Sequence, residues 1–138
     1  MFQVAILDDY TNAALTSSDW DVLPDNYKIT VFNDNLIETD ALVKRLTEFD
    51  IVCAMRERTP FTSEVFNALP NLKLFVTTGM RNAAVDIAAA NKNGVTYINF
   101  FNQIFHGPNL YSGTFQIKTC DADCSNPITT NIPWDSRE

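Results

Sequence analysis

Glycine is scarce in this sequence, which has only 4 glycines among its 138 residues. They stand at Gly79, Gly94, Gly107 and Gly113. No two of them have the spacing of a Gly-x-Gly-x-x-Gly turn, the motif that brings backbone N–H groups close to a pyrophosphate. The sequence therefore predicts that this chain has no dinucleotide-binding turn of its own.

Metal-ligating side chains are few as well, with one histidine and three cysteines. Cys120 and Cys124 have C-x3-C spacing, but His106 is distant from them, so a four-ligand zinc site within one chain would need unusual partners. We interpret both cysteines as free thiols and predict no metal site. Cys53 lies in an apolar segment, where a small buried thiol is the expected role.

Basic residues and long apolar runs are also in short supply. Ten Lys and Arg against 17 Asp and Glu give a formal charge of -7, and this charge argues against a nucleic-acid partner because phosphates would be repelled. No apolar run is long enough to cross a bilayer, and the N-terminus lacks the basic and apolar parts of a signal peptide. We expect a cytoplasmic protein that binds neither nucleic acid nor membrane.

The chain has the composition of a globular protein and a regular alternation of segments that predict strands and helices. It is 46% hydrophobic and 20% charged, and its length has room for one domain with a real core. Strand-length apolar segments stand at 2–7, 28–32, 51–55, 72–78 and 95–98. Helical segments are expected at 11–23, 39–49, 62–69 and shortly after residue 82.

This alternation predicts the α/β class, with a doubly wound parallel sheet of five strands in the order 2-1-3-4-5 and helices on both faces. Residues 99–138 have no sustained periodicity, and only the alternating piece 113–118 could be a strand. We therefore predict one domain over residues 1–98 and an irregular tail over residues 99–138.

A loop between the fourth strand and the helix after it is the candidate ligand site. Its sequence is Thr77-Thr78-Gly79-Met80-Arg81-Asn82. Loops at the carboxyl ends of parallel strands collect ligands, and N–H groups at a helix start favour an anion. The planar guanidinium of Arg81 suits a carboxylate. From these residues alone, an ordinary surface loop is an equally good interpretation.

The same loop takes part in a resemblance to a known family. The chain resembles the D-isomer-specific 2-hydroxyacid dehydrogenases in Ile6-Leu7-Asp8-Asp9-Tyr10, in Met55-Arg56-Glu57-Arg58-Thr59-Pro60, and from Leu72-Lys73-Leu74 through Asn82. The likeness covers residues 1 to about 98. It corresponds to the N-terminal substrate-binding domain of that family, which has a flavodoxin-like fold.

The resemblance implies a substrate and a set of contacts. The ligand would be a small 2-hydroxy or 2-oxo acid, and the intact family enzyme would use NAD or NADP. The implied substrate-binding residues are Thr78, Gly79, Met80, Arg81 and Asn82, with Arg56 and Arg58 on the neighbouring loop.

The chain also departs from the family. Family members continue into a nucleotide domain with the glycine turn, a catalytic Arg, an acid and a His, and this sequence has no such continuation. His106 stands in Phe105-His106-Gly107-Pro108 without an acid partner that would orient an imidazole, so we interpret it as a loop histidine. We expect no cofactor site and no catalytic residue in this chain, weak substrate binding, and a truncated form of the family.

Two alternatives belong to other functional classes. One is a non-catalytic interaction or dimerisation module, because an exposed half-cleft would leave apolar surface for a partner such as a second copy. The other, more remote, is a phosphoacceptor domain of the receiver type, suggested by Asp8 and Asp9 after the first strand. A receiver needs an acceptor Asp after the third strand, whereas this chain has Met55-Arg56, whose positive charge disfavours a cation there. Asp8 and Asp9 are more simply a polar strand end, with one of them capping the next segment of the chain.

The absence of a glycine turn generates a first prediction. Titration of the chain with NADH is expected to give no saturable quenching of Trp20 or Trp134 fluorescence in the micromolar range typical of dedicated sites. Free N-acetyltryptophanamide, titrated in parallel, corrects for light absorbed by NADH. Quenching that saturates in the protein but not in this control would contradict the prediction.

Overall fold

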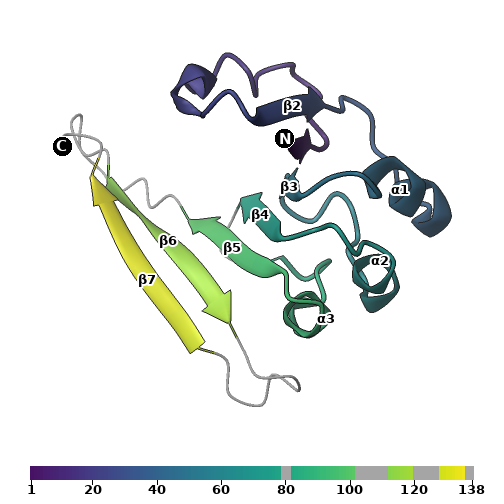
Figure 1. The fold of residues 1–138 in the computed structure, drawn as a ribbon. Helices are drawn as coiled ribbons and strands as arrows, with labels where there is room; N and C mark the ends of the chain where they lie inside the picture. Colours follow the sequence, from purple (N-terminus) through teal and green to yellow (C-terminus); the bar gives the residue numbers. More distant parts are fainter. Residues whose placement is uncertain (79–81, 102–111, 120–127, 136–138) are drawn as a thin grey trace.

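The computed structural model of the chain (Figure 1) describes residues 1–78, 82–101, 112–119 and 128–135. Its strands are β1 (Phe2–Ile6), β2 (Tyr27–Val31), β3 (Ile51–Ala54), β4 (Leu74–Thr78), β5 (Thr96–Phe101), β6 (Ser112–Thr119) and β7 (Ile128–Asp135). Its helices are the 3-10 helix η1 (Trp20–Val22) and the α-helices α1 (Thr39–Leu46), α2 (Ser63–Asn67) and α3 (Ile87–Lys92).

All seven strands belong to one sheet, in the order β2-β1-β3-β4-β5-β6-β7. The first five pair in parallel. Ala5 is in register with Val52, Val52 with Phe75, and Phe75 with Tyr97. The α/β class and the parallel order 2-1-3-4-5 are therefore confirmed.

The tail differs from our expectation, because part of it extends the sheet. β6 pairs antiparallel with β5 and also with β7, so residues 112–119 and 128–135 are strands and not irregular structure. The alternating piece 113–118 lies within β6. The sequence did not predict β7, because Pro133 interrupts that segment. A proline is tolerated in an edge strand, and β7 is at the edge of the sheet. The Ile and Thr residues of the segment favour extended backbone. The boundary after residue 98 stays a prediction.

The three α-helices cover one face of the sheet. Leu42 and Leu46 of α1, Val65 and Phe66 of α2, and Ala89 and Ala90 of α3 all join a single buried cluster. That cluster includes Val52, Phe75 and Tyr97, which the register places on the same face because side chains alternate along a strand. In Figure 1, α1, α2 and α3 lie in a row on that side. Among the described residues, the three α-helices thus lie on one face, whereas we expected helices on both faces.

The connection between β1 and β2 explains this difference. We expected a helix over residues 11–23, but the segment consists of turns followed by η1. The Asp9 carboxylate accepts hydrogen bonds from the backbone N–H groups of Ala13 (3.1 Å) and Ala14 (3.0 Å), and the Ser17 hydroxyl donates to the Ala13 carbonyl (2.6 Å). Such side-chain bonds offer the backbone an alternative to the helical ladder.

Four aromatic rings form the centre of the core. Phe61 packs against Phe75 with ring centroids 4.5 Å apart and against Phe66 at 5.7 Å, while Tyr97 stacks on Phe75 at 6.0 Å. All four side chains are fully buried. Within the part of the chain that the structure describes, the Tyr97 hydroxyl has no hydrogen-bond partner, and burial raises its pKa to about 12.

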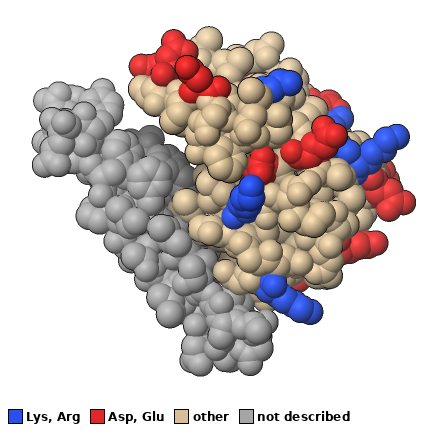
Figure 2. Space-filling model, viewed as in Figure 1, with Lys and Arg blue, Asp and Glu red and all other residues tan. Residues whose placement is uncertain are grey.

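The described surface carries charges of both signs. Figure 2 shows acidic and basic side chains interspersed over the part that is not grey. Two ion pairs join Arg45 to Asp34 and Lys73 to Asp50, each at 2.7 Å, and they hold the pKa values of both carboxyl groups below their ordinary value. None of the helices among the described residues is long and apolar enough to cross a membrane.

The buried hydroxyl of Tyr97 generates the second prediction. Tyr97→Phe keeps the ring and removes an unpaired polar group, so we expect the free energy of unfolding at pH 8 to stay unchanged or rise by about 1 kcal/mol. Because the folded-state pKa is raised above the ordinary value of 10.0, the tyrosine's contribution is present below pH 10 and is lost as the pH rises toward 12. The variant should lose less stability than the wild type over that window.

Urea unfolding at pH 8 and pH 10.5 measures both effects. Tyr10→Phe is the matched control, because the Tyr10 side chain is 54% exposed. This substitution should leave the free energy of unfolding unchanged at both pH values. A loss of several kcal/mol in Tyr97→Phe at pH 8 would show that the hydroxyl makes a stabilising hydrogen bond.

Candidate functional site

The candidate site lies where β1, β3 and β4 end. Ile6 of β1 is in register with Cys53 of β3, and Ala54 of β3 with Thr77 of β4. Because these strands are parallel, the loops that follow them meet at one edge of the sheet. Open α/β sheets bind ligands at this edge, and the crevice opens beside the first strand, where the strand order reverses.

The loop after β1 is held by two buried carboxylates. Asp8, which has a left-handed backbone with φ 60, accepts hydrogen bonds from the Thr59 hydroxyl (2.7 Å) and the Asn35 amide (2.8 Å). Asp9 caps the turn that follows through Ala13 and Ala14, which agrees with the capping role that the sequence suggested. Both carboxylates thus serve the local structure, and the described residues contain no group of three or more potential metal ligands.

Arg58 turns toward the loop after β1. Its guanidinium donates to the Asp8 carbonyl (3.2 Å) and lies 4.4 Å from the centre of the Tyr10 ring. Its own carbonyl accepts a hydrogen bond from the Asn35 amide (3.2 Å). These contacts join the loop after β3, which carries Arg58, to the loop after β1.

Arg56 is joined to the fourth strand and the loop after it. It has a left-handed backbone with φ 50, its N–H donates to the Thr78 hydroxyl (3.3 Å), and its carbonyl accepts a hydrogen bond from the Asn82 amide. The Arg56 side chain is exposed, so its charge is available to a ligand.

Asn82 lies inside the structure, although we expected it to contact substrate. Only 7% of its surface is exposed. Its amide group also donates to the Thr77 hydroxyl (2.9 Å), and its oxygen accepts from the N–H of Ala84 (3.1 Å). The protein itself therefore occupies the hydrogen-bonding groups of this side chain.

The structure brings together Arg56, Thr78 and Asn82 among the residues predicted from the sequence, and it places Arg58 on the β1 side of them. Gly79, Met80 and Arg81 lie outside the described residues, as do His106, Cys120 and Cys124. Cys53 is half-buried, and burial raises the pKa of its thiol to about 11, which agrees with a structural role.

Sequence reasoning missed several residues that shape the site. Thr59 and Asn35 hold the Asp8 carboxylate, and Glu57 accepts a hydrogen bond from the N–H of Ala83 (3.1 Å) through its carboxylate. A sequence signal for Asn35 was available in the polar run Asn33-Asp34-Asn35 directly after β2. Because β2 is parallel to β1, this run lies at the same edge of the sheet as the candidate site. The single Thr59 hydroxyl gave no signal of its own.

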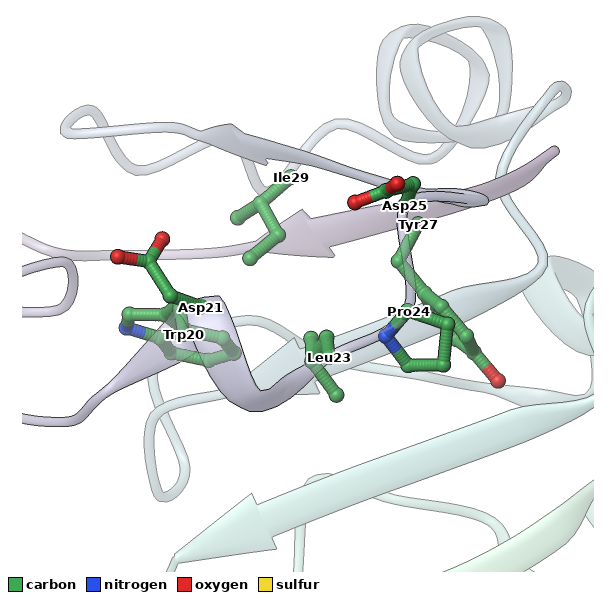
Figure 3. Close-up of a pocket in the computed structure, with 7 residues that line it drawn as sticks. All are labelled: Trp20, Asp21, Leu23, Pro24, Asp25, Tyr27 and Ile29. Carbon is green, nitrogen blue, oxygen red and sulfur yellow. The ribbon is translucent and has the colours of Figure 1, made fainter.

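A pocket elsewhere on the described surface is separate from this edge. It measures about 550 Å³ and is lined by Trp20, Asp21, Leu23, Pro24, Asp25, Tyr27 and Ile29. Figure 3 shows these side chains coming from η1, the turn after it and β2. Tyr27 begins β2, so the pocket extends toward the amino end of that strand, away from the loops that carry the predicted site.

Comparison with known proteins gives a family match. Residues 4–102 match the family model of the D-isomer specific 2-hydroxyacid dehydrogenase catalytic domain. No curated protein sequence gives a significant match.

Solved structures resemble the chain over about a third of their own length. A phosphoglycerate oxidoreductase from Vibrio cholerae O395 is 34% identical, with a TM-score of 0.66 over 75% of this chain and 32% of that one. A D-3-phosphoglycerate dehydrogenase-type oxidoreductase from Ralstonia solanacearum is 29% identical, with a TM-score of 0.62 over 72% and 30%.

A third structure agrees in fold alone. The NAD+-bound 3-phosphoglycerate dehydrogenase of Entamoeba histolytica is 14% identical, with a TM-score of 0.56 over 73% of this chain and 33% of that one.

Proposed function

Since this chain belongs to the D-isomer-specific 2-hydroxyacid dehydrogenase family, we propose that it is the substrate-binding part of an NAD- or NADP-dependent oxidoreductase acting on small 2-hydroxy acids. The carboxylate of the acid binds at the loop after β4, over residues 78–82. Arg56 and Arg58 supply positive charge from the neighbouring loop.

One observation carries this proposal. The loops after β3 and β4 are joined by hydrogen bonds on both sides of residues 79–81, through Thr78 before them and Asn82 after them. The exposed guanidinium of Arg56 belongs to the same assembly. Backbone N–H groups next to a fixed positive charge are a favourable setting for a carboxylate, because charge-assisted hydrogen bonds are stronger than neutral ones.

The proposed role in the reaction is binding and orientation. Oxidation of a 2-hydroxy acid removes a hydride from carbon and a proton from the hydroxyl, and a bound nicotinamide cofactor would accept the hydride. In the intact family the cofactor and the proton-carrying histidine come from a nucleotide domain, whose glycine turn this sequence lacks. The chain therefore holds the acid at its carboxylate end and does not oxidise it alone.

Oxalate, a stable dicarboxylate, tests the proposed site. Titrated into the 138-residue chain, it is expected to shift the amide resonances of residues 79–82 before any others. Arg81→Ala should weaken binding by about tenfold or more because the site loses its nearby charge.

Lys28→Ala is the matched control, since it removes one exposed charge at the far edge of the sheet and should leave the oxalate affinity unchanged. Oxalate binding to Arg81→Ala with wild-type affinity would show that Arg81 is only a solvated surface residue. An absence of shifts in the wild type would contradict the proposed function.

A non-catalytic interaction or dimerisation module is a second candidate. The observation in its favour concerns the face of the sheet away from the helices, where Cys53, Val76 and Ile98 lie in register and are only half-buried. Apolar surface of this kind suits a protein partner, including a second copy of the chain.

This second candidate predicts that the chain sediments as a dimer at micromolar concentrations and that Val76→Arg converts it to a monomer, because a charge cannot be buried unpaired in an apolar interface. Lys44→Glu, on the exposed side of α1, is the control and should leave the mass unchanged. Sedimentation of the wild type as a monomer would remove this candidate.

A further inference from the structure

We propose that Asn82 is a positioning residue, which holds the loop after β3 in its left-handed conformation at Arg56 and thereby sets where that loop faces the substrate. The inference rests on the proposed function for its link to substrate, and on the described geometry for its link to Arg56. It assigns the side chain of Asn82 a role behind the site and not in contact with the acid.

The hydrogen bonds of Asn82 define the orientation of its side chain. The N–H of Ala84 can only donate, so the atom facing it is the amide oxygen. The Arg56 carbonyl can only accept, so the atom facing it is the amide nitrogen, which also donates to the Thr77 hydroxyl (2.9 Å). A primary amide offers two donors and an acceptor without charge. Asn82 uses all three to join β4, the loop after β3 and the turn before α3.

The backbone of Arg56 needs such support. A left-handed conformation is unfavourable for a residue with a Cβ, because the Cβ comes too close to the following carbonyl oxygen, and Arg56 has φ 50. Both of its backbone polar groups are bound from the β4 side, the N–H by the Thr78 hydroxyl and the carbonyl by the Asn82 amide. Strained backbone persists where its surroundings determine it, and such positions cluster at functional sites.

The residues next to Arg56 are held from other directions. The Glu57 carboxylate accepts from the N–H of Ala83 (3.1 Å), and the Arg58 carbonyl accepts from the Asn35 amide (3.2 Å). Three consecutive residues are thus fixed by three neighbouring segments. Among the residues that hold this loop, Asn82 is both buried and bound to Arg56, the residue with left-handed backbone. Loss of the Asn82 amide should therefore change the direction of the loop and not only its mobility.

The experiment compares two nearly isosteric substitutions in the 138-residue chain. Asn82→Asp replaces the donating nitrogen with an oxygen that faces the Arg56 carbonyl, while Thr77→Val removes the other partner of Asn82 and leaves the Arg56 contact in place. We expect Asn82→Asp to weaken oxalate binding by about tenfold and to move the backbone chemical shifts of Arg56 away from left-handed values. Thr77→Val, at a fully buried position, should lower the unfolding midpoint and change the oxalate affinity less than about twofold.

Asn82→Ser, which keeps one donor in a smaller side chain, carries the test if Asn82→Asp does not fold. It should weaken binding by less than Asn82→Asp would. The proposal is overturned if the Arg56 shifts of the folded variants match those of the wild type, or if oxalate binds them with wild-type affinity, because Asn82 would then contribute to stability alone.

The two proposals can fail separately. If the wild type does not bind oxalate, the proposed function fails, and the Arg56 shifts still decide the role of Asn82. If those shifts move in Asn82→Asp and not in Thr77→Val, the control of the loop by Asn82 is upheld without its link to substrate.

Discussion

The parallel pairing of β3 with β4 is the constraint on which the candidate site depends. Their register, from Ile51 with Leu74 to Ala54 with Thr77, makes both strands end at the same level. The two following loops can therefore exchange hydrogen bonds directly, from Arg56 to Thr78 and from Asn82 to Arg56. A shift of one residue would reverse the faces of all side chains in the strand. It would take Val52 and Ala54 out of the core and separate the loops at the same time.

The same register fixes the core beneath the site. Phe75 lies between Phe61, Phe66 and Tyr97, so one aromatic cluster joins β4 and β5 to α2 and the segment before it. Two polar residues follow on the same face of these strands, Thr77 after Phe75 and Asn99 after Tyr97, and they pair across β4 and β5. Both are fully buried. The sheet thus changes from an apolar core to buried polar side chains as it approaches the loops. This change from apolar to polar residues suits a binding site, because polar groups that position loops must themselves be held by a rigid scaffold.

Family membership and the described geometry support a separation of substrate binding and cofactor binding into different parts of the enzyme. The chain covers about a third of the length of the solved structures it resembles, and we propose that this part holds the acid. Under that proposal the substrate-binding part would supply fixed loops and positive charge, while hydride acceptance would belong to a nucleotide-binding part with different backbone requirements. The polar network at Asp8, Thr59 and Asn35 has a matching role on the β1 side, since it fixes the loop that carries Arg58.

The sequence by itself determined the α/β class, the five parallel strands and their order, because hydrophobic runs and turn residues are local signals and the rules for connecting parallel strands leave few topologies. It also located the loops that carry the proposed site. Only the tertiary structure decided that Asn82 is buried behind the loop and that Arg58 turns toward Asp8 and Tyr10. It also replaced the expected helix over 11–23 with turns and gave β7 a place in the sheet. These outcomes depend on partners distant in the chain, such as Arg56 for Asn82 and β6 for β7. A local sequence pattern does not predict which distant group a side chain will contact or which strand an edge strand will pair with.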